Sequence, residues 1–92
     1  MIQITDEKIG ERIFKAIRVL KIDISTLSEI ISEPESVLED VQKGIFRLEI
    51  IKLCRIADHI GVSLDWLILG RSTNVIDYFI ETMEGEDERN WY

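Results

Sequence analysis

Apolar residues recur every three or four positions between residues 6 and 21, the spacing that places them on one face of an α-helix. Thr5 precedes Asp6 and Glu7, which is typical of a helix N-cap followed by an acidic first turn. The pattern predicts a first helix over about residues 6–21. Its apolar face consists of Ile9, Ile13, Ala16, Ile17 and Leu20.

A second, shorter helix is predicted over about residues 24–31. Asp23 is a suitable N-cap, and Leu27, Ile30 and Ile31 supply a short apolar face.

A third helix is predicted directly after it. Residues 32–35 (SEPE) match a capping box, with Ser32 at the cap, Glu35 three residues later and Pro34 in the first turn. Gly44 is expected to end the helix. The buried stripe consists of Val37, Leu38 and Val41.

A fourth helix is predicted from about Leu48 to Ile60, closed by Gly61. Two registers fit its inward face, and both include Ala57 and Ile60. One adds Leu48, Ile51 and Cys54, and the other adds Ile50 and Leu53.

Two further helices complete the expected fold. Ser63 can cap a fifth helix over 64–69 that Gly70 closes, and Asn74 can cap a sixth that Gly85 stops. The apolar side of the sixth helix contains Val75, Ile76, Phe79, Ile80 and Met83. Residues 86–92 are polar and acidic, with Trp91 and Tyr92 at the end, and are expected to fray. No segment alternates like a strand, so the sequence predicts an all-α fold of five helices with a C-terminal sixth helix and an acidic tail.

The charge balance opposes non-specific binding to nucleic acid. The chain of 92 residues, enough for one domain, carries a formal charge of −7, the wrong sign for attraction to phosphates. Residues 23–42 contain six acidic and no basic side chains. This block is either an interaction surface that rejects or mimics DNA, or an ordinary solvated face.

Few residues suit catalysis or metal binding. Cys54 and His59 are the sole cysteine and histidine, which excludes an internal disulfide and a His/Cys zinc cage within the chain. Cys54 is expected to be a small buried hydrophobe and Trp66 a core residue. Asp58 is adjacent to His59 on a helix, so the two side chains diverge and form no catalytic dyad. We therefore expect neither an enzyme nor a cofactor or metal site. Without a signal peptide or membrane-spanning segment, a cytoplasmic location and no membrane partner are expected.

Two stretches carry a resemblance to a known family. Residues 9–13 (IGERI) and 56–67 (IADHIGVSLDWL), with Leu27 in the second helix and Gly44 after the third, resemble Cro/repressor-type helix-turn-helix domains, the lambda-repressor-like XRE family. The resemblance covers about residues 9–70. It implies a helix-turn-helix domain over 1–70, with a C-terminal helix and acidic tail over 71–92.

The resemblance implies that the third helix contacts DNA bases. Several positions at which the family has DNA-contacting residues carry other residues in this sequence. The family's glutamine at the start of the second helix is Ile24 here, and its first-helix arginine is Ile17. The candidate DNA contacts are Arg12, Ser36, Gln42, Lys43 and Arg47, with Lys15, Arg18 and Lys52 as further flanking bases. Carboxylates beside them would repel phosphates. These acidic residues are Glu33, Glu35, Glu39 and Asp40.

Two functions remain open. The resemblance implies a small transcriptional regulator that binds double-stranded DNA as a homodimer through its third helix. The alternative is a protein-binding module on the same scaffold, for example a repressor antagonist whose acidic face occupies a partner's basic surface. The apolar side of the sixth helix either forms the dimer interface or folds back on the body. The interface candidates are Val75, Ile76, Phe79 and Ile80.

Overall fold

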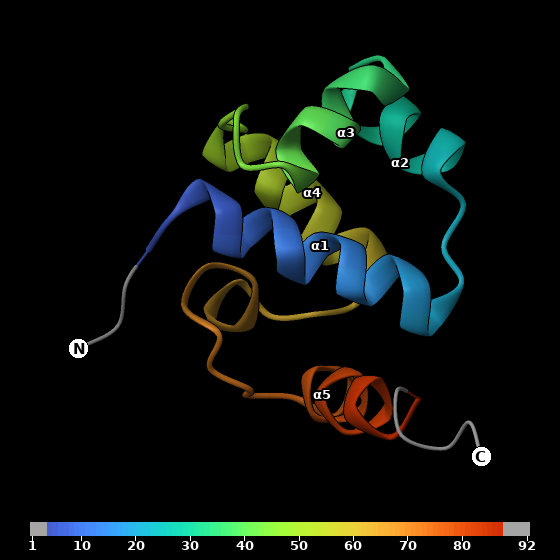
Figure 1. The fold of residues 1–92 in the computed structure, drawn as a ribbon, viewed down its shortest axis with the longest axis vertical. Helices are drawn as coiled ribbons and strands as arrows, with labels where there is room; N and C mark the ends of the chain where they lie inside the picture. Colours follow the sequence, from blue (N-terminus) through green and yellow to red (C-terminus); the bar gives the residue numbers. More distant parts are fainter. Residues whose placement is uncertain (1–3, 88–92) are drawn as a thin grey trace.

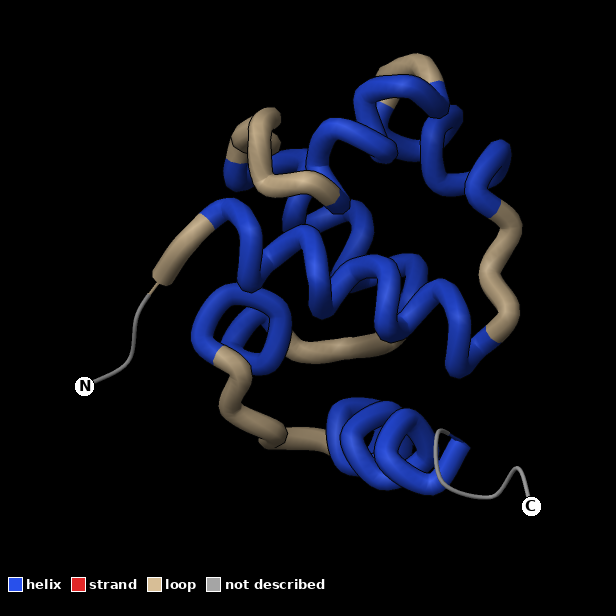
Figure 2. Tube along the Cα trace, viewed as in Figure 1, coloured by secondary structure: helices blue, strands red, loops and turns tan. Residues whose placement is uncertain are grey.

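The computed structural model describes residues 4–87, with side chains described through Met83. In chain order its helices are α1 (Asp6–Leu20), α2 (Ile24–Ile31), α3 (Glu35–Gln42), α4 (Ile50–Ile60), a short π-helical turn η1 (Asp65–Leu69) and α5 (Val75–Asp87). Between residues 4 and 87 no strand is present (Figure 2). The all-helical class predicted from the sequence is confirmed.

Helix α1 lies at the centre of the molecule (Figure 1). It contacts α3 on one side and η1 and α5 on the other. Thr5 caps α1 as expected, since its side-chain oxygen accepts a hydrogen bond from the backbone N–H of Lys8 at 3.0 Å. The central place of α1 means that the positions of α3 and α5 both depend on it.

Gly10 permits the close approach of α1 and α3. A β-carbon at this position would lie 1.9 Å from the carbonyl oxygen of Val41, far inside van der Waals contact. The obstacle is α3 backbone, which cannot move aside as a flexible side chain could. Any larger residue at position 10 would therefore push α3 away from α1.

The core joins apolar side chains from every helix. Ile13 and Ala16 of α1 and Trp66 of η1 are completely buried, as predicted. Ile9, Ile17 and Leu20 pack against this core and are partly buried. The buried set is Ile13, Phe14, Ala16, Leu27, Ile31, Leu38, Val41, Leu48, Leu53, Ile56, Ala57, Ile60, Val62, Trp66, Leu67 and Ile80.

Helix α4 differs from its prediction in start and in inward face. It begins at Ile50, and Leu48 is buried from the preceding loop rather than from the helix. Cys54 is exposed, so its prediction as a buried hydrophobe is wrong. The observed inward face consists of Leu53, Ile56, Ala57 and Ile60. This face leaves Ile50 and Ile51 exposed, because a helix buries only one side against the core.

The predicted capping box before α3 is not formed. Ser32 adopts the left-handed conformation (φ 57°) and closes α2, while Pro34 is the N-cap of α3 without a side-chain hydrogen bond. The Glu35 carboxylate instead accepts a hydrogen bond from the Ser25 hydroxyl at 2.7 Å. The turn uses Ser32 to end one helix, so this residue is not available to start the next.

Helix α5 folds back on the body. Ile80 is completely buried and Ile76 packs against the core, which removes Ile80 from the predicted dimer interface. The helix also continues to Asp87, so the prediction that Gly85 stops it is wrong. Asn74 does cap it, because its side-chain oxygen accepts from the backbone N–H of Asp77 at 2.8 Å.

A buried carboxylate fastens α5 to the rest of the chain. Asp77 has no exposed surface. It accepts hydrogen bonds from the N–H and hydroxyl of Ser63 at 2.9 and 2.6 Å and from the N–H groups of Thr73 and Asn74 at 3.0 and 3.2 Å. Burial by itself would raise the pKa of Asp77, but these hydrogen bonds stabilise the ionised form and lower the pKa overall.

The approach of α1 and α3 predicts the effect of Gly10→Ala. Alanine favours a helix over glycine by about 1 kcal/mol, yet the clash with Val41 outweighs this gain. We expect a net loss of about 1–3 kcal/mol in the free energy of unfolding, measured by urea denaturation. The exposed neighbour Glu11→Ala is the control and should change stability by less than about 0.5 kcal/mol. A Gly10→Ala protein as stable as the parent would contradict this packing.

The Asp77 hydrogen bonds predict a dependence of stability on pH. Because the pKa of Asp77 is lower in the folded chain, the ionised carboxylate stabilises the fold above about pH 4. This contribution is lost as the pH falls through the folded-state pKa. Asp77→Asn should lose about 1–3 kcal/mol at neutral pH in urea denaturation, and its difference from the parent should shrink in acid. A difference in unfolding free energy between Asp77→Asn and the parent that stays constant down to the lowest pH at which the chain folds would contradict this role. Asp58→Asn, at an exposed position, serves as control.

Candidate interaction surface

Helices α2 and α3 correspond to the second and third helices predicted from the sequence. The resemblance described above implies that the third of these helices contacts DNA. Residues 32–34 join them, and the buried Leu27 and Ile31 of α2 and Leu38 and Val41 of α3 hold them on the core. The opposite side of α3 faces outward. Its exposed residues are Glu35, Ser36, Glu39, Gln42 and Lys43.

Carboxylates alternate with the polar candidates along the outer side of α3. Helical spacing aligns Glu35, Glu39 and Gln42 in one row. A second row contains Ser36, the partly buried Asp40 and Lys43. Ser36 and Gln42 of α3 and its C-cap Lys43 are all exposed. The structure places at least one acidic residue beside each of them, so this surface carries more negative than positive charge.

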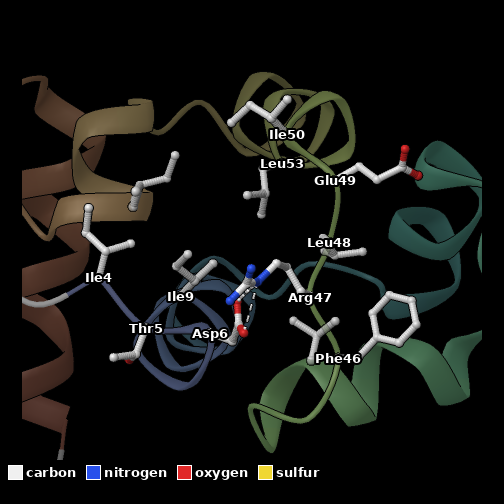
Figure 3. A pocket seen from close by; sticks show the side chains of 12 residues that line it. Ile4, Thr5, Asp6, Ile9, Phe46, Arg47, Leu48, Glu49, Ile50 and Leu53 are labelled. Atoms are coloured by element: carbon white, nitrogen blue, oxygen red, sulfur yellow. Dashed lines mark hydrogen bonds and ion pairs between the residues drawn. The ribbon is translucent and has the colours of Figure 1, made fainter.

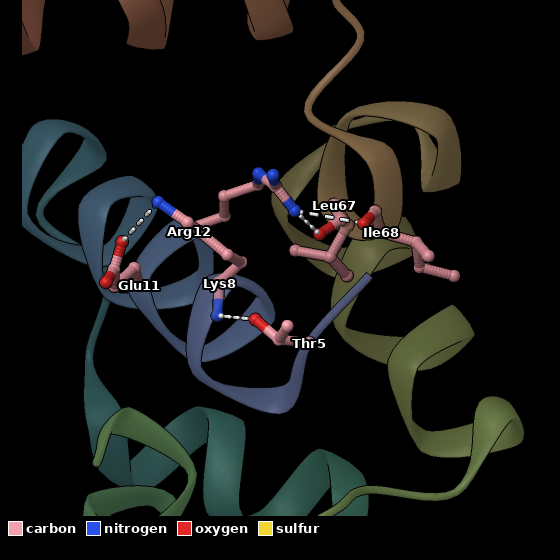
Figure 4. A network of polar contacts seen from close by, with 6 residues as sticks. All are labelled: Thr5, Lys8, Glu11, Arg12, Leu67 and Ile68. Carbon is pink, nitrogen blue, oxygen red and sulfur yellow. Dashed lines mark hydrogen bonds and ion pairs between the residues drawn. The ribbon is translucent and has the colours of Figure 1, made fainter. Parts of the chain in front are cut away.

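Arg12 is not part of this surface. Its terminal nitrogen Nη1 donates hydrogen bonds to the carbonyl oxygens of Leu67 and Ile68 at 3.1 and 3.0 Å (Figure 4). Burial lowers the pKa of Arg12, although the charges of Glu81 and Glu11 partly oppose this shift. The side chain joins α1 to η1, so a DNA contact by Arg12 would require these two hydrogen bonds to break.

Arg47 is on the surface, but its charge already has a partner. Its Nε atom lies 3.1 and 3.2 Å from the two carboxylate oxygens of Asp6, and the side chain is 82% exposed (Figure 3). The hydrogen bond and charge of Asp6 raise the pKa of Arg47. A phosphate would have to compete with Asp6 for this guanidinium.

The predicted flanking bases Lys15 and Lys52 form ion pairs within the chain. The Nζ atom of Lys15 lies 3.0 Å from a carboxylate oxygen of Glu81 in α5. Lys52 pairs with Glu33 and lies 4.0 Å from Glu49. Arg18 is exposed near the end of α1. Lys15 and Arg18 line one hollow together with Gln42 of α3, whereas Lys52 lies beside Glu33 and Glu49.

An apolar surface beside α3 was not predicted. After Gly44, the exposed fractions are 71% for Ile45, 36% for Phe46, 56% for Ile50 and 62% for Ile51. A groove of about 550 Å³ lies between the start of α1, the 46–49 loop and the start of α4 (Figure 3). Its apolar lining consists of Ile4, Ile9, Val41, Phe46, Leu48, Ile50, Leu53 and Ile68. The signal in the sequence is that residues 45–51 contain more apolar side chains than one helix face can bury.

The predicted dimer residues are divided between core and surface. Val75 is 80% and Phe79 44% exposed, whereas Ile76 and Ile80 face the body. Tyr78 and Met83 extend the outer apolar side of α5, with exposed fractions of 60% and 38%. An interface on α5 would therefore keep Val75 and Phe79 of the predicted set and use Tyr78 and Met83 in place of Ile76 and Ile80.

The part of the chain that the structure describes contains neither a candidate metal site nor a membrane-spanning helix. Among its side chains, no group of three or more His, Cys, Asp or Glu residues could hold a metal ion. None of its helices has the length and hydropathy needed to cross a bilayer. Comparison with protein-family models, curated proteins and solved structures finds no match to this chain.

The contacts of Arg12 predict a structural effect on mutation. Arg12→Met keeps much of the apolar stem but removes both hydrogen bonds to η1. We expect a loss of about 1–3 kcal/mol in the free energy of unfolding, measured by urea denaturation. Lys43→Met, at an exposed position, is the matched control and should change stability by less than about 0.5 kcal/mol. Equal stability of the two variants would show that Arg12 does not fasten η1.

Proposed function

We propose that this chain is a regulatory protein with a lambda-repressor-like helix-turn-helix scaffold, and that its α2–α3 surface binds another protein rather than DNA. The order and lengths of α1 to α4, with the short turn between α2 and α3, support the helix-turn-helix assignment. The resemblance of residues 9–13 and 56–67 to that family supports it independently.

The chemistry of the exposed surface carries the protein-binding proposal. A reader of DNA needs cations for phosphates and hydrogen-bond donors for base edges. The outer side of α3 offers Glu35 and Glu39, and the next segment offers Ile45 and Phe46. Two like charges about 7 Å apart repel by roughly 2–3 kcal/mol at an effective dielectric constant near 20, before salt screening. An acidic surface bordered by apolar residues is complementary to a basic, partly apolar protein surface.

DNA binding by a homodimer is the second candidate. Ser36, Gln42 and Lys43 are exposed together on α3, and each can contact a base edge or a phosphate. The outer side of α5, with Val75, Tyr78, Phe79 and Met83, would supply the two-fold interface that paired half-sites require. A homodimer on α5 is compatible with either function.

Binding to mixed-sequence duplex DNA, measured by fluorescence anisotropy over a range of salt concentrations, separates the two functions. We expect no salt-dependent affinity for the parent chain, because the α3 surface carries excess negative charge. The proposal fails if the logarithm of the affinity falls linearly with the logarithm of the salt concentration and Lys43→Ala reduces that slope by about one unit.

A pair of matched variants tests whether α3 itself faces the nucleic acid. Glu39→Gln removes a carboxylate from the outer side of α3, and Glu29→Gln removes an exposed one from α2. If the chain binds protein, neither variant should gain affinity for DNA. A gain with Glu39→Gln but not with Glu29→Gln would assign α3 to DNA and contradict the proposal.

A further inference from the structure

The apolar groove between the start of α1, the 46–49 loop and the start of α4 is not used by the function proposed for the α2–α3 surface. It is open to solvent along the 46–49 loop, and Ile4 and Ile50 at its edges are 60% and 56% exposed (Figure 3). Exposed side chains of this size are costly in water unless a partner covers them. Its volume of about 550 Å³ is enough for several apolar side chains of a docked segment.

The charges at the groove favour a cationic occupant. Of its lining residues, Asp6 and Glu49 are acidic and Arg47 is basic. Arg47 is held by Asp6, so it does not offer a free positive charge. Lys52 is shared between Glu33 and Glu49, which leaves one carboxylate in excess there, and the Glu49 side chain is 79% exposed.

The same charges disfavour a second copy of this chain. The exposed apolar side of α5 is the partner surface that another copy could insert, but residues 72–92 contain six acidic and one basic side chain. Like charges would meet at the groove edge and oppose docking.

We propose that this groove binds a cationic amphipathic segment of a partner protein, with its apolar side chains in the groove and its lysine or arginine side chains toward Glu49. The proposal rests on the protein-binding function above and adds the site and the chemistry of the ligand.

Two designed peptides of about 18 residues, five helical turns, test this site. Both have leucines along one side; one has lysines and the other glutamates on the opposite side. Titration into the full chain, followed by anisotropy of a label on the peptide, should give at least about tenfold tighter binding of the lysine peptide. Failure of the lysine peptide to bind, or equal binding of both peptides, would overturn the proposal.

The chain offers a matched pair of isoleucines as controls. Ile50 lines the groove and Ile51 does not, while both are exposed on the first turn of α4. Ile50→Ala should weaken the lysine peptide about tenfold and Ile51→Ala less than about twofold. Glu49→Gln should weaken it about two- to threefold. Far-UV circular dichroism checks that each variant keeps its helices.

The outcomes separate this site from the proposed function. Equal effects of Ile50→Ala and Ile51→Ala, with a loss of peptide binding in Glu39→Gln, would reject the groove but keep protein binding through α3. Salt-dependent DNA binding that Lys43→Ala weakens would reject the function itself. Self-association that Ile50→Ala abolishes in sedimentation would assign the groove to a second copy. If removal of residues 88–92 raises the affinity for the lysine peptide about tenfold, the groove would be assigned to the chain's own terminus.

Discussion

The packing of α1 against α3 at Gly10 is the constraint on which the other features depend. A β-carbon there would meet the Val41 carbonyl oxygen at 1.9 Å, so only glycine allows this approach. Val41 also lines the apolar groove, and α3 carries the exposed acidic side chains. The same contact thus sets the position of both candidate binding surfaces relative to the core.

The opposite side of α1 uses its positive charge to hold the C-terminal half of the chain. Arg12 donates to the carbonyl oxygens of η1, and Lys15 pairs with Glu81, which also accepts a hydrogen bond from the Trp66 indole at 2.8 Å. Burial would raise the pKa of Glu81, but these two partners lower it overall. Together with the buried Asp77, they make α5 part of the folded body. These contacts engage two cations of α1 within the chain.

Acidic and apolar side chains adjoin at the outer edge of α3 and the following loop. Either kind alone would have an ordinary explanation, because solvated carboxylates and single exposed hydrophobic residues are common on protein surfaces. The groove beside them is lined by apolar residues and by the carboxylates of Asp6 and Glu49, and this combination is the physical basis of the proposed binding of a basic amphipathic segment. The residues that hold α2 and α3 on the core are separate from this surface, since Leu27 and Leu38 are buried and Glu35 and Glu39 are not.

The sequence by itself determined the helices, most of the core and the sign of the surface charge, because these follow from local periodicity, capping and composition. It could not determine which side of α4 faces inward, since two registers fit the pattern and Cys54 proved exposed. It placed Arg12 at DNA and Ile80 at a dimer interface, whereas one binds the η1 carbonyl groups and the other fills the core. These assignments depend on contacts between residues distant in the chain. Only the tertiary structure decides them, because the free energy of burying or pairing a side chain depends on the atoms that surround it.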